Sequence, residues 1–481
     1  MTIKSGLLTD LYELTMMQGY HHYELNPRVV FDMFFRRQPF HGGFSVFAGL
    51  DDLLTILENL HFSEEDLEYL DSLGMFRRDF LDVLKDFRFR GDIWAMDEGT
   101  TVFPHEPLIR VHATLMEAQL IESLLLNIIN FQTLIATKTA RIYLASNHGK
   151  IAEFGLRRAQ GVDGAISASR AAYIGGAAAT SNVYAGKRFN IPVTGTMAHS
   201  WVMAFDDELE AFDRFAELYP EAAVLLIDTY DTLDSGIPNA VKIGRRLKEK
   251  GLSFGVRLDS GDIQYLSIQV RKALDAAGLT DATIAASNEL NEDIIHQLVA
   301  AGTPIDLWGV GTHLVTGGSE ASFSGVYKLA AKEVDGVFQP TMKVSDNPEK
   351  STNPGIKQVH RFLDDNGCPL ADLMTFDDDG IDPDRTYTLH HPYVDYRHVR
   401  MRPRGPVVPL LKKYMENGTV VGKRPTLGEI QDLAKRNLDS LDQTYRRIIN
   451  PHIYKVSISD SIKNTKGEML RKYLGNHEEE E

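Results

Sequence analysis

The chain has 481 residues, 43% hydrophobic and 25% charged, which is the composition of a globular protein of roughly two or three domains. Its single cysteine, Cys368, excludes an internal disulfide framework and a cluster of thiolate metal ligands. The formal net charge of -16 argues against nucleic acid or an anionic membrane as the main partner, but it leaves small anions open as substrates.

The beginning of the chain carries no pattern of an export signal. Asp10 and Glu13 fall where a signal peptide needs an unbroken apolar run, and no small-residue cleavage site follows. The most apolar stretch, "SLLLNIINFQTLIA" at residues 123–136, is too short to span a bilayer and contains three amide side chains. We therefore expect a cytoplasmic protein that has no membrane partner.

Residues 1–145 are predicted to form an N-terminal mixed α/β domain. The stretch "RGDIWAMDEGTTVFPHEPLIRVHA", residues 90–113, has the short β-rich runs and Gly/Pro breaks of antiparallel strands. The following "LMEAQLIESLLLNIINFQTLIA", residues 115–136, has apolar residues at helical spacing. We expect part of residues 330–410 to complete this domain.

Residues 146–330 are predicted to form an irregular (β/α) barrel, the catalytic domain of an α/β protein. Helical stretches at 236–251 and 262–278 alternate with short apolar runs, a pattern shared by barrels and doubly wound sheets. The runs are 150–154, 191–195, 222–227, 252–256, 281–286 and 305–310. Each run stops at a polar or glycine-containing cluster, and ligands of both architectures bind beyond the carboxyl ends of the strands.

Beyond residue 330 the pattern loosens. Residues 341–361, "TMKVSDNPEKSTNPGIKQVHR", form a basic, loop-rich stretch within an acidic protein. Residues 410–481 are predicted to be a smaller helical region, with an amphipathic helix or helix pair at 426–448 and a solvated acidic tail, "EEEE".

The motif "GVRLDSGD" places charged residues at the end of one predicted strand. The Arg257 guanidinium suits a carboxylate or phosphate, and Asp259 suits ribose hydroxyls or a magnesium ion. The alternative is an Arg–Asp pair that closes a turn, with Asp262 capping the next helix. The motif by itself leaves both hypotheses open.

Two further clusters follow neighbouring strands. In "DTYD", Asp228 is either a ligand or a helix cap, and Asp231 follows three residues later. In "WGVGTHLVTGG", residues 309–312 have backbone N–H groups that suit a phosphate at a helix N-terminus. As a bare glycine pattern this second signal is weak.

An aromatic motif and a histidine complete the set. In "EFGLRRAQG", Phe154 suits the face of a planar ligand, with Arg157 nearby for its anion; the alternative is a core phenylalanine with exposed arginines. His199 in "TMAHS" is either a packed corner histidine or an acid, base or nucleophile. No serine or cysteine nucleophile motif and no Walker-type phosphate loop accompanies it.

Taken together, these motifs resemble the nicotinate phosphoribosyltransferases, which are type II phosphoribosyltransferases related to the nicotinamide and quinolinate enzymes. The "LLTDLYELTMMQGY" and "FFRRQPFHGGFSVFAGL" blocks near the N-terminus extend the likeness, which runs in family order from about residue 5 to about residue 450. The resemblance implies ATP-coupled conversion of nicotinate and 5-phosphoribosyl 1-diphosphate (PRPP) into nicotinate mononucleotide and diphosphate in NAD biosynthesis. It also implies that ATP phosphorylates His199.

The resemblance implies roles for the other residues. Phe154 would stack on the pyridine ring, and Tyr12 from the second subunit of a homodimer would cover the opposite face. Arg257 would bind the pyridine substituent or the diphosphate, and Asp259 would bind the ribose or Mg²⁺. The phosphates would be held by Arg157, Thr196, Asp228, Gly309, Gly311, Thr312, Lys343, Lys350 and Lys357, with Arg36 and Arg37 as further candidates.

One position bears on the choice of substrate. Where the nicotinamide enzyme has an aspartate, this chain has "ATSN", with Ser181 at the matching position or Asn182 if the match shifts by one. Either side chain donates a hydrogen bond to a carboxylate, which an aspartate would repel. We expect nicotinate as the substrate. The alternatives are a nicotinamide- or quinolinate-type enzyme and a non-catalytic sensor of a phosphoribosyl ligand, which would be expected to lack His199 or the "RLDSGD" acids.

Overall fold

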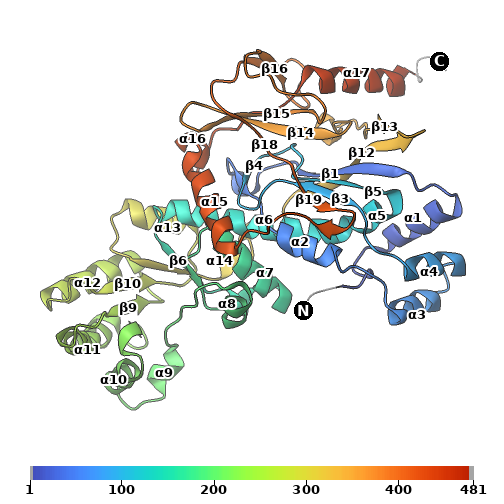
Figure 1. Cartoon of the computed structure of the whole chain (residues 1–481). Helices are drawn as coiled ribbons and strands as arrows, with labels where there is room; N and C mark the ends of the chain where they lie inside the picture. Colours follow the sequence, from blue (N-terminus) through green and yellow to red (C-terminus); the bar gives the residue numbers. More distant parts are fainter. Residues whose placement is uncertain (1–3, 476–481) are drawn as a thin grey trace. The chain divides into compact units, whose positions relative to one another are not determined.

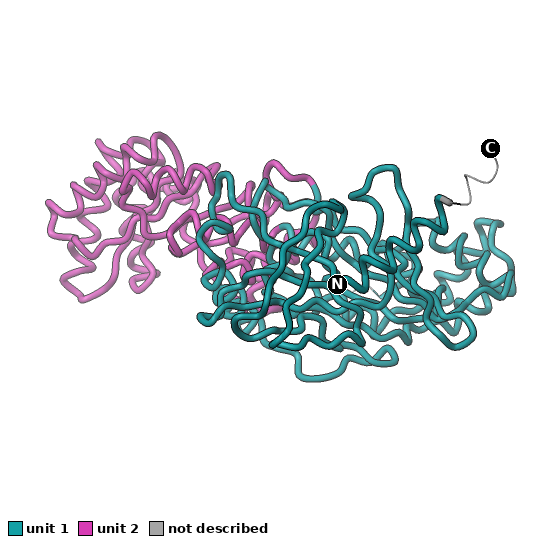
Figure 2. Tube along the Cα trace, turned by 90° about the horizontal axis from the view of Figure 1, so that it is seen from above, with its two compact units in different colours: residues 1–134, 322–481 teal, residues 135–321 magenta. Residues whose placement is uncertain are grey.

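The computed structural model describes residues 4–475, and the chain divides into two compact units (Figure 2). Unit 1 comprises Met1–Leu134 and Ser322–Glu481, and unit 2 comprises Ile135–Ala321. The predicted acidic tail lies outside the described residues. Within those residues, no helix is long and apolar enough to cross a bilayer.

Unit 1 is built on a seven-stranded antiparallel sheet (Figure 1). Its order is β13 (Val337–Pro340), β12 (Gly325–Val334), β1 (Arg28–Phe35), β5 (Ile109–Thr114), β3 (Asp92–Ala95), β19 (Lys412–Glu416) and β20 (Thr419–Val420). Strands β3 and β5 confirm the antiparallel strands predicted within residues 90–113. The helical stretch that follows is α5 (Leu115–Leu120) and α6 (Glu122–Ala145), and α5 begins at a capping box between Thr114 and Glu117.

A second sheet of unit 1 has six strands. Its order is β17 (His398–Met401), β16 (Tyr387–His390), β21 (Val456–Ile458), β15 (Pro369–Phe376), β14 (Lys357–Leu363) and β18 (Val407–Pro409). A two-stranded sheet pairs β2 (Ser45–Val46) with β4 (Thr101–Val102). The helices of unit 1 are α1 (Leu11–His22), η1 (Pro39–His41), α2 (Leu50–Leu57), α3 (Glu64–Ser72), α4 (Arg78–Lys85), η5 (Pro348–Lys350), α15 (Leu427–Ser440), α16 (Gln443–Arg446) and α17 (Asp460–Gly475). Residues 410–481 thus supply strands to both large sheets as well as helices.

Unit 2 is an α/β fold around a six-stranded, all-parallel sheet (Figure 1). The order is β7 (Ala179–Thr180), β6 (Lys150–Glu153), β11 (Leu307–Val310), β10 (Thr283–Ala286), β9 (Gly255–Leu258) and β8 (Val224–Leu226). The helices are η2 (Leu156–Arg158), α7 (Gly161–Ile174), α8 (Val183–Phe189), α9 (His199–Met203), α10 (Glu208–Leu218), η3 (Pro220–Ala222), η4 (Thr232–Gly236), α11 (Ile237–Glu249), α12 (Ile263–Ala276), α13 (Glu292–Ala300) and α14 (Thr312–Val315).

The α/β class and the parallel sheet confirm the predicted fold, but the strand pairings do not close into a barrel within residues 4–475. The outer strands β7 and β8 are only two and three residues long, so each offers few ladder hydrogen bonds to a further strand. The run at 191–195, predicted to be a strand, forms one parallel bridge between Thr180 and Val193. Each of the other five predicted runs overlaps a strand of the parallel sheet.

The core of unit 2 lies between the parallel sheet and its helices. Buried aliphatic residues of β8, β9 and β10, including Leu225, Val256 and Ile284, pack with the inward faces of α10, α11 and α12. Because the strands are parallel, the polar residues that follow each of them share one edge of the sheet.

Candidate active site

The carboxyl edge of the parallel sheet gathers the charged residues that the sequence singled out. Asp228 follows β8, Arg257 lies in β9, and Asp259 follows it directly. His199 begins helix α9 and reaches this group through contacts given below. The ordered strand ends therefore place residues far apart in the sequence within hydrogen-bonding reach.

Arg257 is the most connected side chain of this group. Its Nε donates to Ser287 Oγ at 3.0 Å, and its Nη1 donates to Thr196 Oγ1 at 2.7 Å and to the Met197 carbonyl at 3.2 Å. Its Nη2 lies 3.2 Å from Asp259 Oδ1. Three of the five N–H donors of the guanidinium make hydrogen bonds, and Nη2, which is in ion-pair contact with Asp259, has an N–H free for a ligand.

The side chain of His199 is accessible to solvent and is not packed in the core. Its side chain is 40% exposed, Nδ1 lies 3.1 Å from Thr229 Oγ1, and Nε2 lies 3.7 Å from Asp259 Oδ2. Helix α9 is anchored on its other side by the buried Val202 and by Trp201, whose Nε1 donates to the Ala211 carbonyl at 3.0 Å. This anchoring leaves the histidine ring at the site with a carboxylate beside it.

The four aspartates of the two acidic motifs divide into two helix caps and two residues that cap no helix. Asp231 and Asp262 are helix caps, because their carboxylates accept backbone N–H groups at the starts of η4 and α12. Asp228 caps no helix. Its Oδ2 accepts the Asp259 N–H at 2.9 Å and the Ser260 hydroxyl at 2.6 Å, whereas its buried Oδ1 has no partner among the described residues.

Gly309 in β11 and Gly311 just after it lie against Phe154. A Cβ at Gly309 would lie 2.7 Å from ring atoms of Phe154, and one at Gly311 would lie 3.1 Å from the Phe154 carbonyl. The Arg257 guanidinium carbon is 6.0 Å from the centroid of the same ring. Packing of Phe154 thus accounts for Gly309, and Gly311 precedes α14, which begins at Thr312.

The hydrogen bonds of Ser181 and Asn182 distinguish these two candidates for binding the carboxylate. Asn182 is buried, accepts the Ala185 N–H as the cap of α8 and donates to Ser169 Oγ at 3.2 Å. These contacts occupy both ends of its amide. The Ser181 N–H donates to the Glu153 carbonyl, and its hydroxyl has no partner within residues 4–475. Ser181 is therefore the better placed of the two to meet a ligand.

The remaining predicted residues are scattered. Arg157 is exposed in η2 of unit 2, whereas Tyr12, Lys343, Lys350 and Lys357 belong to unit 1. Tyr12 on α1 is 48% exposed, and Lys343 and Lys350 are exposed; Arg36 and Arg37 follow β1.

Lys357 departs from its predicted phosphate-binding role. The side chain is buried, lies 2.8 Å from Asp32 Oδ2, and donates to the carbonyls of Asn353 and Gly355. Burial lowers the pKa of Lys357, and Asp32 opposes that shift. All three ammonium donors have partners inside unit 1, so we remove this residue from the proposed phosphate-binding set.

Sequence reasoning missed Ser287 and Thr229, which contact Arg257 and His199 respectively. Ser287 belongs to no motif, and Thr229 lies inside "DTYD", where only the aspartates were considered. Ser287 lies immediately beyond the end of β10 and Thr229 lies three residues beyond the end of β8, and this position after a parallel strand is the only signal that pointed to them.

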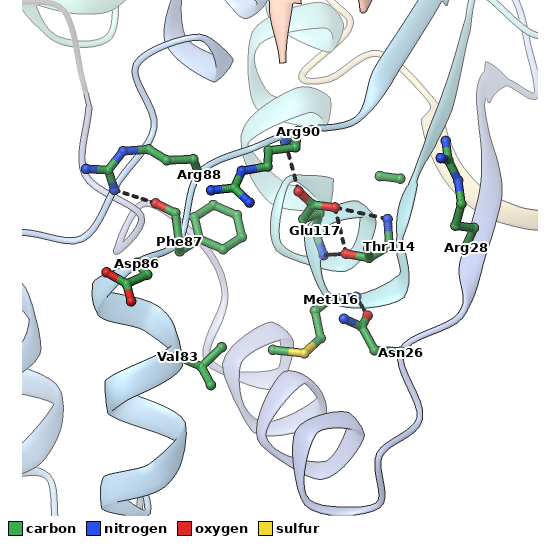
Figure 3. Close-up of a pocket in the computed structure, with 11 residues that line it drawn as sticks. Asn26, Arg28, Val83, Asp86, Phe87, Arg88, Arg90, Thr114, Met116 and Glu117 are labelled. Atoms are coloured by element: carbon green, nitrogen blue, oxygen red, sulfur yellow. Dashed lines mark hydrogen bonds between the residues drawn. The ribbon is translucent and has the colours of Figure 1, made fainter. Parts of the chain in front are cut away.

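A hollow of about 360 Å³ lies elsewhere, on unit 1 (Figure 3). The Glu117 carboxylate at its edge accepts the backbone N–H groups of Arg90 and Thr114. None of the predicted site residues lines this hollow, whose lining is Asn26, Arg28, Val83, Asp86, Phe87, Arg88, Arg90, Ala113, Thr114, Met116 and Glu117.

Comparisons with known proteins agree over nearly the whole chain. Residues 7–130 match the nicotinate phosphoribosyltransferase N-terminal domain, 149–367 match the nicotinate phosphoribosyltransferase family, and 356–466 match the C-terminal domain. Nicotinate phosphoribosyltransferase of Bacillus subtilis is 43% identical over 478 residues, which cover 99% of this chain and 97% of that protein. The human nicotinate phosphoribosyltransferase is 33% identical, with 95% of each chain covered.

Solved structures give the same picture. The crystal structure of human nicotinic acid phosphoribosyltransferase superposes with a TM-score of 0.83 at 29% identity, covering 96% of this chain and 100% of that one. The nicotinate-nucleotide pyrophosphorylase from Pyrococcus furiosus has a TM-score of 0.69 at 22% identity, which shows a shared fold.

Proposed function

The chain belongs to the nicotinate phosphoribosyltransferase family, the enzymes that act on nicotinate in NAD biosynthesis, and from this premise we propose that its transfer reaction is coupled to ATP through His199. The observation that carries this proposal is the placement of His199 Nε2 3.7 Å from Asp259, whose other oxygen contacts Arg257. A non-catalytic sensor would have no need of this arrangement. The names of the relatives favour nicotinate over nicotinamide or quinolinate.

The transfer step joins nicotinate to the ribosyl carbon of PRPP. The pyridine nitrogen donates its electron pair to C1 of the ribose, and the bond from C1 to the diphosphate oxygen breaks, its electrons leaving with diphosphate. The free N–H of Arg257 and the Ser181 hydroxyl would hold the carboxylate, and Phe154 would stack on the ring. Positive charge that develops at the ribose would be stabilised by the neighbouring Asp259.

The coupling step places a phosphoryl group on His199. One ring nitrogen attacks the terminal phosphorus of ATP, a P–N bond forms, and the P–O bond to ADP breaks, so ADP leaves with the electron pair. The attacking nitrogen is the unprotonated one, and the proton on the other ring nitrogen stays there or passes to water. Water later cleaves the P–N bond and releases phosphate. The exposed ring and the adjacent carboxylate support this role.

A divalent cation fits the same edge of the sheet. Asp228 Oδ1 is buried without a partner, and Asp259 Oδ2 faces the site, so these two carboxylates would hold Mg²⁺. Within the described residues no group of three or more metal-binding side chains is assembled, so substrate phosphates and water would complete the shell. Bound Mg²⁺ would neutralise charge on the diphosphate.

The proposal extends to the partners of the enzyme. We expect a cytoplasmic homodimer in which Tyr12 of the partner subunit covers the open face of the pyridine, consistent with the exposure of this residue on α1. The phosphates of PRPP and ATP would meet Arg157, Thr196, Gly309, Gly311, Thr312, Lys343 and Lys350.

The test is a comparison of initial rates of mononucleotide formation with nicotinate and with nicotinamide, each with and without ATP. We expect ATP to stimulate the reaction with nicotinate in the wild type and not in His199→Ala, which should retain a basal rate. His296→Ala, at an exposed histidine of α13 in the same unit, serves as the matched control and should behave as the wild type.

Two results would contradict parts of the proposal. Full ATP coupling in His199→Ala would make this histidine a structural residue. A preference for nicotinamide would show that Ser181 does not select the carboxylate. Transfer of the terminal phosphate of labelled ATP to the wild-type chain, absent from His199→Ala, provides a second and direct measurement.

A further inference from the structure

Ser287 is buried and contacts both Arg257 of β9 and Asp259, the residue that follows β9. Its backbone N–H donates to the Leu258 carbonyl at 2.9 Å, continuing the parallel pairing of β10 with β9. The residue is therefore fixed directly opposite Asp259, and its side chain has little freedom to move.

The hydroxyl of Ser287 has a defined direction. Arg257 Nε can only donate, so at 3.0 Å the serine oxygen must accept from it. The single hydroxyl proton is then available to Asp259 Oδ1, which lies within hydrogen-bonding distance. The Leu258 carbonyl, at 3.3 Å, is the longer alternative. A charged acceptor favours the first arrangement.

The consequence is a preferred orientation of the Asp259 carboxylate. Oδ1 is bound by both Ser287 and Arg257 Nη2, which leaves Oδ2 as the oxygen that faces His199. Arg257 in turn binds Thr196 through Nη1, and Thr196 lies three residues before His199 in the same segment. The contacts of Arg257, Ser287 and Asp259 therefore connect back to the segment that carries His199.

We propose that Ser287 is a positioning residue that couples the arginine of the pyridine site to the phosphate-accepting histidine. This proposal rests on the function proposed above. It explains how binding of a carboxylate at Arg257 changes the surroundings of His199. A carboxylate that binds the free N–H of Arg257 shifts the guanidinium, Ser287 transmits the shift to Asp259, and Asp259 changes its contact with His199. Ser287 itself touches no substrate.

The experiment compares Ser287→Ala with Ser287→Thr and with Ser267→Ala. Alanine keeps the Cβ, so it removes the hydroxyl with minimal change in packing, and threonine restores a hydroxyl. Ser267 is a buried serine on α12 of the same unit that donates to the Gln264 carbonyl at 3.1 Å, which makes it a control for the loss of any buried hydroxyl. The quantities measured are kcat, KM for nicotinate and the ATP hydrolysed per mononucleotide formed.

We expect Ser287→Ala to lower kcat by about tenfold to a hundredfold, the range for losing a hydrogen bond to a charged group. The amount of ATP hydrolysed per product should rise, because the state of His199 is no longer coupled to binding of nicotinate at Arg257. Ser287→Thr should restore the ratio, and Ser267→Ala should match the wild type in both quantities. Ser287→Cys, which keeps the volume but donates weakly, should fall between alanine and wild type.

A normal ATP-to-product ratio in Ser287→Ala, or an equal change in Ser267→Ala, would overturn the inference. Failure of the proposed function looks different, since the wild type itself would then show no ATP stimulation. In that case the effect of Ser287→Ala on kcat without ATP still decides whether the serine positions Arg257 and Asp259.

Discussion

Asp259 and Asp262 are three residues apart in one motif, yet the fold gives them different environments. Asp259 contacts Arg257 and Ser287 and faces the histidine, whereas Asp262 accepts the Tyr265 N–H at the start of α12. Gly261, with a φ of +77°, turns the chain between them. Each aspartate follows a strand and precedes a helix, so the sequence alone left both roles open for the motif.

Substitutions can distinguish the catalytic role of Asp259 from the structural role of Asp262. Asp259→Asn keeps the shape but removes the charge, so we expect kcat to fall by about a hundredfold while the melting temperature changes little. Asp262→Ala should lower the free energy of unfolding by about 1 kcal/mol through loss of the cap and leave kcat intact. Steady-state rates and urea unfolding of both variants provide the measurement, and the reverse pattern would contradict the assignment.

The buried Lys357–Asp32 pair gives a prediction about stability. Lys357→Met leaves the Asp32 carboxylate buried and uncompensated, so we expect a loss of about 3–5 kcal/mol in the free energy of unfolding. The double variant Lys357→Met/Asp32→Leu should recover much of this loss. Urea unfolding measures the free energy of unfolding of both variants.

Lys343→Ala, at an exposed lysine, should instead raise KM for PRPP or ATP without lowering the free energy of unfolding.

At the scale of elements, a buried polar cluster ties strands of unit 1 together. Arg361 of β14 forms a two-pronged ion pair with Asp372 of β15, and the Tyr454 hydroxyl donates to the same carboxylate. Glu106, just before β5, accepts the Phe103 N–H and lies in this cluster fully buried. Burial and the neighbouring Asp372 carboxylate raise the pKa of Glu106 well above its ordinary value of 4.5.

This cluster predicts a pH dependence of stability. Glu106 binds its proton more tightly in the folded than in the unfolded chain, so its contribution is complete below pH 4.5 and declines as the pH rises towards the folded pKa. Glu106→Gln mimics the protonated form and should flatten this decline, giving a higher melting temperature than the wild type at pH 8. Thermal unfolding between pH 5 and about pH 9 checks this. Glu65→Gln, at an exposed glutamate of α3, should leave the profile unchanged.

The elements also show which parts of the fold a single sequence predicts. Five strands of the parallel sheet overlap short runs rich in apolar residues, and they were predicted because this pattern is local. Strand β7 has two residues, too few for any pattern, and Val193 forms only a bridge. Lys357 was misjudged because its partner Asp32 is distant in sequence, and Ser287 was missed because its partners are known only once β9 and β10 are adjacent.

At the scale of the whole molecule, the residues assigned to the proposed function are divided between the two units. Phe154, His199 and Arg257 belong to unit 2, while Tyr12 and the two exposed lysines belong to unit 1. If the face of the pyridine is covered by Tyr12 of the partner subunit, each site needs two chains, and an isolated chain should be nearly inactive.

Complementation tests this sharing of sites. Tyr12→Ala and His199→Ala should each be defective in ATP-coupled synthesis, but co-expression should form mixed dimers with one intact site. With random pairing, about a quarter of all sites are intact, so activity should recover to about a quarter of the wild type. Mixing Tyr12→Ala with itself provides the control. No recovery in verified mixed dimers would mean that Tyr12 serves its own chain.

The lone thiol offers a way to observe such an assembly. Cys368 lies just before β15, partly exposed, and burial together with Asp364 raises the pKa of its thiol, so attachment of a reagent proceeds faster at mildly alkaline pH. One nitroxide spin label can then be attached to each chain at Cys368, and no cysteine has to be introduced by mutation. Any dipolar oscillation in a pulsed electron paramagnetic resonance trace comes from two chains held together, and its frequency gives the spacing between the labels.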